Sequence, residues 1–220
     1  MTELRIEPLT AHHAAAGGAL LAASHRDYPA FRDVFPDPRI RTRVLAPFQT
    51  AATRDAIRYG HAVGAFLDDR LVGVALWQPP GRFPLSPLRK ARMAPALARA
   101  AIAARAAFGR FARSGAALER AFPDEPSWYL QALGVHPNAQ RQGIGAALLT
   151  AGLELVDADH VACHLHTSDP ANVEYYRRWG FSLTQPAFAA GAGGPTYYGM
   201  TRPASQRPDL GAGAPRSESI

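Results

Sequence analysis

The sequence predicts an α/β fold of the mixed, α+β type, in which one twisted sheet carries helices on both faces. Two patterns support this prediction. Strand and helix patterns alternate along most of the chain, which is typical of a sheet covered by helices. Residues 128–167 also read as strand, helix, strand, and this order predicts a parallel pair joined by a right-handed crossover. A hairpin in the first half adds antiparallel neighbours to the sheet.

The N-terminal residues predict a strand followed by a helix. Apolar positions over residues 4–9 mark a short strand, which ends near Pro8 and the capping position of Thr10. An alanine-rich helix is expected over residues 11–24.

Several prolines lie in the next stretch of the sequence. We expect Pro29, Pro36 and Pro38 to divide it into turns. A second helix is predicted over residues 40–59, interrupted or begun again near Pro47, because proline removes a helical N–H.

The predicted hairpin follows this helix. Two apolar runs, residues 62–67 and 70–78, flank Asp68-Asp69, which is a turn signal between strands. Pro79-Pro80-Gly81 should end the second strand.

A basic segment over residues 84–122 is expected to form a helical insert in two pieces. Pro95 should lie near the start of the longer piece, and Gly109 or Gly115 near its end. The formal net charge of the chain is +6, and this segment is rich in arginine. Arg99 is interleaved with apolar residues, as on the wet face of an amphipathic helix. A solvated face is therefore the first interpretation, a substrate or cofactor lid the second, and a nucleic-acid surface a distant third.

The second half predicts further strands and helices around a glycine turn. The expected elements are a strand over 128–135, a helix to about 157, a strand over 161–167, a helix over 172–179, and paired strands over 181–183 and 197–201. Residues 1–203 should form a single domain. Residues 204–220 are rich in Pro, Gly and Ser, and we expect them to be a disordered tail.

Composition restricts the class of protein. The 220 residues suffice for one buried core, and 47% of them are hydrophobic, which argues against wholesale disorder. No apolar run is long enough to span a bilayer, and Glu3, Arg5 and Glu7 interrupt the region where a signal peptide would be apolar. The one cysteine, Cys163, cannot form an internal disulfide, which fits a reducing compartment. We expect a cytoplasmic protein without membrane contact.

The stretch from Leu133 to Leu149 indicates the kind of ligand. An apolar run and Pro137 lead into Gln140-Arg141-Gln142-Gly143-Ile144-Gly145, which opens a helix. A glycine turn lets backbone N–H groups point outward, and a helix N-terminus adds its positive dipole end, so the two together suit phosphate oxygens. The sequence therefore predicts a ligand that carries a pyrophosphate.

Two other phosphate loops do not fit this turn. A dinucleotide-binding loop needs an acidic residue about twenty positions on, whereas Asp157 and Asp159 lie too near and follow a helix. A nucleoside-triphosphate loop needs Gly-Lys-Ser/Thr, which is absent. The pattern Gln140-x-x-Gly143-x-Gly145 between a strand and a helix instead resembles the cosubstrate loop of the GNAT acetyltransferases, which use acetyl-CoA.

A second motif resembles the same family. His164-Leu165-His166-Thr167-Ser168 is followed by Asn172, Tyr176 and Gly180-Phe181. Asn172 and Tyr176 are four residues apart and share one helix face. The resemblance implies that Asn172 contacts the cosubstrate and that Tyr176, rather than Tyr175, gives a proton to the departing thiolate.

The resemblance also implies a fold and a set of binding residues. In the GNAT fold, the strands expected here at 128–135 and 161–167 splay apart and leave a slot for thioester and amine. The first strand would pair with the pantetheine arm, a backbone N–H near Val135 would stabilise the oxyanion, and the turn would bind the pyrophosphate. The implied cosubstrate-binding residues are Leu133, Gly134, Val135, Gln140, Arg141, Gln142, Gly143, Ile144, Gly145, Ala146, Asn172 and Tyr176. Residues 125–137 further resemble the branch of the family that contains puromycin N-acetyltransferase.

The general base is left open among three candidates. Glu125 stands at the entrance of a strand, Tyr129 lies on that strand with a neighbouring water, and His166 lies on the facing strand. His166 alternates with His164, so one of the two is expected to face the slot. A hydrogen-bonded strand histidine is the simpler interpretation of both, and two ligands without a third do not predict a metal. Cys163 lacks neighbours that would activate a nucleophile.

The sequence thus predicts an N-acetyltransferase that moves acetyl directly from acetyl-CoA to the amine of a small molecule in a ternary complex. Alternatives are a protein or peptide amine as acceptor, and a CoA-binding regulator without turnover, whose CoA binding would survive Tyr176→Phe. A nucleic-acid binder would show salt-steep affinity for DNA. We expect no nucleic-acid partner, and a homodimer is left open.

Overall fold

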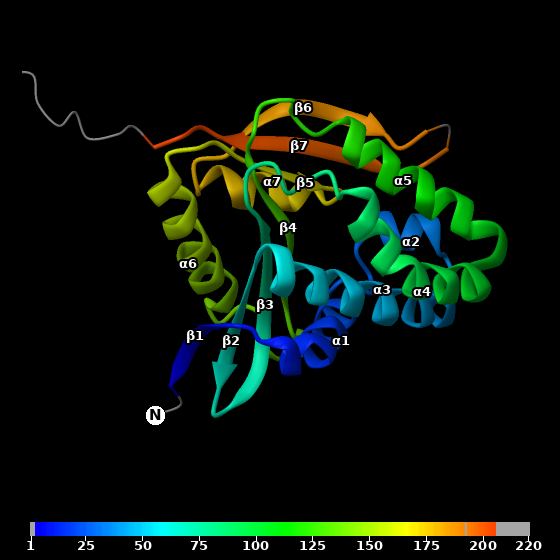
Figure 1. Cartoon of the computed structure of the whole chain (residues 1–220), viewed down its shortest axis with the longest axis horizontal. Coiled ribbons are helices and arrows are strands. Elements are labelled where there is room, and N and C mark those ends of the chain that lie inside the picture. The colour runs from blue at the N-terminus through cyan, green and yellow to red at the C-terminus, as the bar shows by residue number, and fades with distance from the viewer. Residues whose placement is uncertain (1–2, 192, 206–220) are drawn as a thin grey trace, which may run out of the picture.

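The computed structural model describes residues 3–191 and 193–205, and Figure 1 labels its elements. The strands are β1 (Leu4–Pro8), β2 (His61–Leu67), β3 (Arg70–Gln78), β4 (Trp128–Val135), β5 (Cys163–Thr167), β6 (Ser182–Ala189) and β7 (Thr196–Arg202). The helices are α1 (Ala14–Ser24), α2 (Pro29–Val34), α3 (Pro38–Tyr59), α4 (Pro87–Ala104), α5 (Phe108–Arg120), α6 (Ile144–Asp159) and α7 (Pro170–Arg177). Short 3₁₀ turns are η1 (Ala11–His13), η2 (Arg105–Ala107) and η3 (Pro137–Ala139).

The strands form one mixed sheet, which confirms the predicted fold class. Its order is β1-β2-β3-β4-β5-β7-β6. β4 and β5 are parallel, and the other neighbouring pairs are antiparallel. The predicted crossover therefore runs from β4 through α6 to β5. The predicted hairpin is β2–β3, and Asp68 and Asp69 make its turn with φ values of 46° and 62°.

Helices cover both faces of this sheet, as Figure 1 shows. One face packs against α6 and α7, and its core includes Trp77, Leu148 and Leu165. The other face packs against α1 and α3, around Leu21 and Leu76. Because side chains alternate along a strand, neighbouring residues of β3 serve the two cores.

Gly152 allows α6 to lie close to the sheet. A Cβ built at this position would lie 2.1 Å from the Trp77 ring, so a larger side chain would force helix and strand apart. The contact sets the height of α6 above β3. It therefore also sets where the N-terminus of α6 lies relative to β4.

Two of the three prolines expected to form turns begin helices instead. Pro29 and Pro38 occupy the first turn of α2 and α3, where a missing N–H costs little. The prediction of turns at these two positions is therefore wrong, whereas Pro36 does separate the two helices. α3 runs without a break through Pro47.

The basic segment is helical in two pieces, but its division differs from the prediction. The break lies at Arg105–Ala107, where Arg105 has a φ of 46°. Pro95 lies inside α4, and Gly109 and Gly115 lie inside α5. A glycine inside a helix costs only about 1 kcal/mol, an amount that tertiary packing readily offsets.

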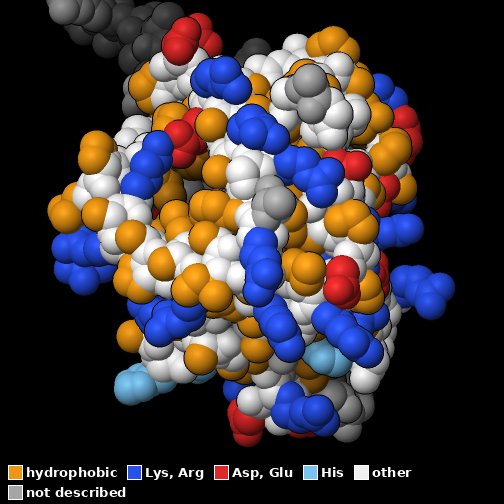
Figure 2. Space-filling model, turned by 90° about the vertical axis from the view of Figure 1, so that its right-hand side faces the viewer, with side chains coloured by type: hydrophobic (Ala, Val, Ile, Leu, Met, Phe, Trp, Pro, Cys, Tyr) orange, Lys and Arg blue, Asp and Glu red, His pale blue; other side chains and the backbone are white. Residues whose placement is uncertain are grey.

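The outer face of α4 is solvated, as the first interpretation of the basic segment expects. Arg99 is exposed, while Ala96 and Ala100 are buried. On the face of the molecule shown in Figure 2, Lys and Arg side chains are dispersed among hydrophobic ones.

Most of the predicted tail, residues 206–220, lies outside the described residues. Ser205, at its edge, donates a hydrogen bond from Oγ to the carbonyl oxygen of Asp157 at 3.0 Å. Within the described ranges, no helix combines the length and the apolar content that a membrane span needs.

Candidate active site

The parallel strands β4 and β5 separate shortly after they meet. They pair at Trp128↔Cys163, Tyr129↔His164 and Leu130↔Leu165, although both strands continue. From Ala132 to Val135, β4 pairs with β3 on one side, and beyond Leu130 no described strand pairs with its other edge. Backbone donors and acceptors on this edge are available to an extended ligand.

A cavity of about 470 Å³ opens at this separation. Side chains of both strands line it, together with Asn172 and Tyr176 of α7. Its volume lies in the range of small-molecule sites. The cavity therefore joins the free edge of β4 to a tyrosine side chain.

The glycine turn has the backbone geometry of an anion cradle. Arg141 and Gly143 have φ values of 62° and 79°, and Gly143 caps α6 in the left-handed conformation that favours glycine. The first N–H groups of α6 have no partner inside the helix. Gln140 donates from Nε2 to the carbonyl oxygen of Val135 at 3.2 Å, which ties the turn to the end of β4. These groups fit a pyrophosphate, and the binding roles of residues 140–146 stay predictions.

The two adjacent tyrosines of α7 lie in different surroundings. The Tyr175 hydroxyl oxygen lies 3.7 Å from a Cβ built at Gly145, so it is next to the glycine turn. Tyr176 lines the cavity and is 9% exposed. Burial raises the pKa of Tyr176, so its hydroxyl stays protonated at neutral pH. Of the two tyrosines, the one that lines the cavity is therefore Tyr176, which the spacing to Asn172 and Gly180 predicts.

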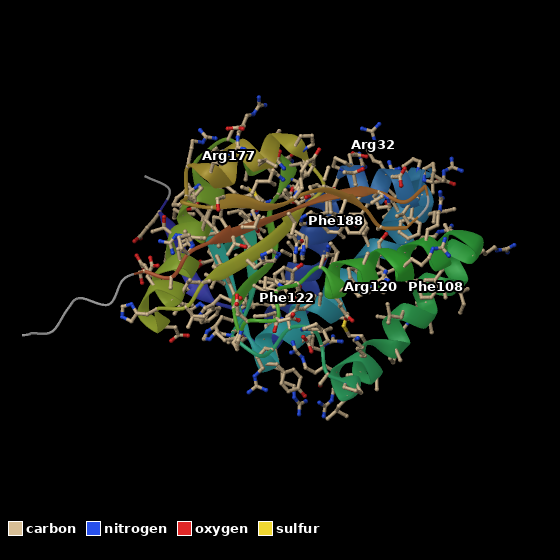
Figure 3. The ribbon with its side chains drawn as sticks, turned by 90° about the horizontal axis from the view of Figure 1, so that it is seen from above. Arg32, Phe108, Arg120, Phe122, Arg177 and Phe188 are labelled. Carbon is tan, nitrogen blue, oxygen red and sulfur yellow. The ribbon has the colours of Figure 1, made fainter. Side chains whose placement is uncertain are left out.

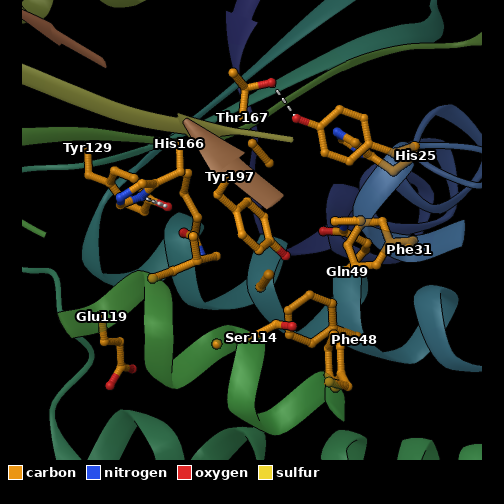
Figure 4. Close-up of a pocket in the computed structure, with 18 of the residues that line it drawn as sticks. His25, Phe31, Phe48, Gln49, Ser114, Glu119, Tyr129, His166, Thr167 and Tyr197 are labelled. Carbon is orange, nitrogen blue, oxygen red and sulfur yellow. Dashed lines mark hydrogen bonds between the residues drawn. The ribbon is translucent and has the colours of Figure 1, made fainter. Parts of the chain in front are cut away.

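Thr167 organises the end of β5 beside Asn172. Asn172 donates from Nδ2 to the Thr167 hydroxyl oxygen at 3.3 Å, and the Tyr28 hydroxyl contacts the same oxygen at 2.6 Å. Figure 4 draws this second bond. The Tyr28 hydroxyl also accepts from the backbone N–H of Ser168 at 2.8 Å. Tyr28, which sequence reasoning missed, therefore fixes the loop between β5 and α7.

His164 and His166 lie on the same side of β5, and one of the two, His166, lines the cavity, as expected. Residues two apart on a strand share a face, and the ring centroids are 4.6 Å apart. His166 lines the cavity and His164 lies behind it, fully buried. Tyr129 reaches the same place, with its hydroxyl oxygen 3.4 Å from His166 Nδ1. Two of the three candidate bases thus lie together.

Burial keeps both imidazoles neutral. It lowers the pKa of His166 to about 4, and burial together with the neighbouring His166 lowers the pKa of His164 to about 3. Aromatic rings enclose the pair: Phe122 packs on His164 and Phe188 on His166. Figure 3 labels both phenylalanines beside the sheet.

These pKa values predict how stability depends on pH. Each ring binds a proton more weakly in the folded chain than in the unfolded chain, where the pKa of a histidine is near 6.5. The free energy of unfolding should therefore be highest above pH 6.5 and fall as the pH drops towards 4, by at most about 1.4 kcal/mol per pH unit for each ring. Urea unfolding of wild type and His164→Asn between pH 7.5 and 4.5 measures this. An acid dependence as steep in the variant as in wild type would contradict the assignment.

Two further candidates do not take part in this cluster. Glu125 is exposed, lies before β4 and is absent from the cavity lining, so its placement gives no support to a role as base. Cys163 is fully buried, and burial raises the pKa of its thiol to about 12. A thiol held protonated in this way is a poor nucleophile.

Aromatic side chains from the first half of the chain form the far wall of the cavity. Figure 4 shows Phe31 and Phe48 there, opposite Tyr129 and His166, with Tyr197 between. Phe111 of α5 packs edge-on against Phe48 at 5.0 Å. Sequence reasoning missed this wall, because apolar residues at helical spacing look alike whether they face a core or a cavity.

A buried ion pair attaches the inserted helix α4 to the rest of the fold. Arg89, 4% exposed, contacts both carboxylate oxygens of Asp55 on α3, with Nε 3.0 Å from Oδ1. Its Nη2 also donates to Gln78 Oε1 at 2.8 Å, and Gln78 donates to Gln131 Oε1 at 2.7 Å. Because Gln131 lines the cavity, this network connects α3, α4 and β4 at the cavity wall.

Charge inside the cavity is sparse. Glu119 is the one acidic lining residue in the described part of the chain, and Lys90 Nζ lies 2.6 Å from its Oε2. Among the described residues, no group of three or more His, Cys, Asp or Glu is placed to hold a metal ion. The cavity therefore suits a ligand that is largely apolar.

Comparison with known proteins gives a family and a set of similar folds. Residues 23–181 match the model of the acetyltransferase (GNAT) family. A Corynebacterium glutamicum structure described as histone acetyltransferase HPA2 and related acetyltransferase is 21% identical, with a TM-score of 0.67, and covers 94% of this chain and 99% of its own.

Two insect enzymes have similar folds. A polyamine N-acetyltransferase from Drosophila melanogaster is 16% identical, with a TM-score of 0.62, over 90% of this chain and 99% of its own. Arylalkylamine N-acetyltransferase 2 from Aedes aegypti is 13% identical, with a TM-score of 0.58, over 91% of this chain and 98% of its own. At these identities the likeness concerns the fold.

Proposed function

The chain belongs to the acetyltransferase (GNAT) family, and on that premise we propose that it transfers acetyl from acetyl-CoA to the amine of a small molecule with an apolar, aromatic body. The observation that carries the choice of acceptor is the aromatic cavity at the separation of β4 and β5. By their names, proteins with similar folds act on protein, polyamine and arylalkylamine substrates. The fold therefore leaves the class of acceptor open, and the lining of the cavity is the evidence for choosing among them.

The donor end of the site fits acetyl-CoA. Backbone N–H groups around Gly143 and the N-terminus of α6 suit the pyrophosphate. The free edge of β4 between Gln131 and Val135 suits the amides of the pantetheine arm, which would pair as an added strand. Bound acetyl-CoA supplies a thioester carbonyl for attack by the amine.

The acceptor end favours an apolar amine over a peptide or a polyamine. A peptide chain brings backbone N–H and C=O groups that need partners, whereas Phe31, Phe48 and Phe111 offer none. A polyamine brings several positive charges, and the acidic Glu119 is already paired with Lys90. Flat aromatic rings, by contrast, gain from edge-to-face and offset packing on this wall.

The chain's own groups divide the chemistry between two sides of the cavity. Tyr176 holds a proton that it can give to the leaving sulfur. A backbone N–H on the free edge of β4, near Val135, is available to the developing oxyanion. Tyr129 and His166, whose polar atoms lie 3.4 Å apart at the cavity, would take the proton that the attacking amine loses.

We further infer that the chain is of the puromycin N-acetyltransferase-like branch of the family. The resemblance of Glu125–Leu130, Leu133–Val135 and Pro137 supports this. It also agrees with an acceptor that carries aromatic groups.

Thiol release from acetyl-CoA across a panel of amines tests the proposed function. The panel should hold an aromatic monoamine, an aliphatic polyamine and an acidic peptide. We expect kcat/KM to be highest for the aromatic monoamine. Turnover restricted to the peptide or the polyamine would contradict the proposed acceptor, and CoA binding with no turnover would support a regulator instead.

Phe111→Ala should weaken binding of the acceptor amine without affecting binding of acetyl-CoA. The variant removes ring contacts at the cavity wall, and we expect KM for an aromatic amine to rise about tenfold, since aromatic contacts of this kind contribute about 0.5–1.5 kcal/mol beyond buried area. KM for acetyl-CoA should stay within about twofold. Steady-state kinetics with each substrate varied measures both.

Ile102→Ala is the matched control, because it shortens a side chain on α4 that is 77% exposed. It should leave both KM values unchanged. An equal rise in KM for the amine in Phe111→Ala and Ile102→Ala would contradict a direct contact between Phe111 and the amine. It would mean that substitutions in α4 and α5 affect amine binding by destabilising these helices.

A further inference from the structure

A chain of hydrogen-bonding side chains crosses the sheet from the cavity to the surface. The Tyr129 hydroxyl oxygen lies 3.4 Å from His166 Nδ1, and His166 Nε2 lies 3.2 Å from His164 Nε2. Beyond the cavity, His164 Nδ1 lies 2.9 Å from Thr201 Oγ1. Thr201 Oγ1 in turn lies 2.9 Å from Thr184 Oγ1 on β6.

The side chains of this hydrogen-bonded series are buried near the cavity and become exposed at its far end. Tyr129 and His166 line the cavity, and His164 is fully buried. Thr201 is partly exposed and Thr184 is exposed. Each member carries both a hydrogen-bond donor and an acceptor, because a neutral imidazole has one of each and a hydroxyl can do both.

We infer that this series of hydrogen-bonded side chains is a proton relay. In it, His164, Thr201 and Thr184 conduct to solvent the proton that the acceptor amine loses at Tyr129 and His166. The inference rests on the proposed function. His164 and the two threonines would act through His166 and touch neither substrate, so they are positioning residues.

The proton balance of the reaction requires such an exit. An ammonium acceptor loses two protons as its new C–N bond forms and the C–S bond of the thioester breaks. One proton ends on the CoA sulfur by way of Tyr176, and the other must reach water. As the amine gives a proton to the Tyr129 oxygen, the hydroxyl hydrogen of Tyr129 passes to His166 Nδ1 and the Nε2 hydrogen of His166 to His164. The Nδ1 hydrogen of His164 then passes to the Thr201 oxygen, the hydroxyl hydrogen of Thr201 passes to Thr184, and the hydroxyl hydrogen of Thr184 leaves to water.

The surroundings of the relay keep its members uncharged between turnovers. Among the described residues, the titratable groups that face the two imidazoles are each other and Tyr129 on β4. Their other neighbours are uncharged: Phe122 after α5, Gln185 and Phe188 on β6, and Thr201 on β7. Burial lowers the pKa of both histidines and raises that of Tyr129. The chain therefore passes a proton along without storing one.

Thr201→Val tests the relay with little change in shape. In wild type, the amine can bind as ammonium and lose its proton in the cavity, so kcat/KM should fall only gradually below the amine's own pKa. In the variant, only amine that is already neutral in solution reacts. We expect kcat/KM at pH 7 to fall about tenfold or more, and the difference from wild type to shrink as the pH approaches the pKa of the amine.

Two matched variants separate a relay from a structural role. Thr201→Ser restores the hydroxyl and should restore the wild-type pH profile. Thr196→Val makes the same exchange at an exposed position of β7 and should change nothing. A loss in Thr201→Val that is equal at every pH, or an unchanged profile, would overturn the relay. Absence of thiol release by wild type with every amine would overturn the proposed function first, and the relay with it.

The ring tautomers give a readout that needs no activity. An outward relay requires a proton on Nε2 of His166 and on Nδ1 of His164 in the resting protein. Nitrogen-15 NMR of the histidine side chains at pH 7 reports these positions. Protons on Nε2 of both rings would leave no acceptor between them and would overturn the relay.

Discussion

Tyr176→Phe should lower kcat for the preferred amine by about 100-fold or more while leaving KM for acetyl-CoA nearly unchanged. The variant keeps the ring and its packing against Phe181, whose centroid is 5.7 Å away, and removes only the proton donor. Burial raises the pKa of Tyr176, so the loss should persist across the neutral pH range. Steady-state thiol release at pH 7, with each substrate varied in turn, measures the effect.

Tyr175→Phe is the control for this variant, because the two tyrosines are adjacent on α7 and face different surroundings. Tyr175 lies next to the glycine turn rather than in the cavity. It should keep kcat within about twofold of wild type, with any effect appearing in KM for acetyl-CoA. Full kcat in Tyr176→Phe at neutral pH would show that another group protonates the sulfur.

Arg89→Met should lower the free energy of unfolding by about 3–5 kcal/mol. The variant leaves the Asp55 carboxylate buried without its cation, and uncompensated buried charge is costly. It also removes the donor to Gln78 Oε1, so the attachment of α4 beside Gln131 is weakened. Urea unfolding followed by circular dichroism measures the change, and KM for the amine should rise with it.

Two comparisons sharpen this result. Lys90→Met breaks the neighbouring ion pair between Lys90 and Glu119. Because the Lys90 side chain is 49% exposed, this variant should lower the free energy of unfolding by less than about 1 kcal/mol. The double variant Asp55→Leu, Arg89→Met removes both charges and should recover much of the loss. A double variant less stable than Arg89→Met would show that the carboxylate has another partner.

Residues whose pattern is local could be predicted from the sequence. The β2–β3 hairpin follows from two apolar runs around Asp68-Asp69, and the sequence predicts β4 at 128–135, its observed bounds. The position of Tyr176 at the cavity follows from its spacing to Asn172. In each case a short stretch holds both the signal and the structure.

Helix boundaries at proline and glycine were less predictable. The sequence predicts a turn at Pro29, whereas Pro29 begins α2, because proline is common both in turns and in the first turn of a helix. Gly115 was expected near a helix end and lies within α5. Propensities of about 1 kcal/mol yield to packing that the sequence does not reveal.

Contacts between distant residues were beyond sequence reasoning. The pairing of Arg89 with Asp55, and the contact of Tyr28 with Thr167, join segments that only the tertiary fold brings together. The rule that residues two apart share a strand face would have placed His164 beside His166. The aromatic wall needed the course of α4 and α5, which the sequence leaves open.

A competition assay tests the central claim most directly. The wild-type protein is given acetyl-CoA and an equimolar mixture of an aromatic monoamine, an aliphatic polyamine and an acidic peptide, and mass spectrometry identifies the acetylated products. The proposed function predicts that the N-acetylated aromatic monoamine forms first and dominates. Acetylation of the peptide or the polyamine ahead of it, or no acetylated product at all, would contradict the claim.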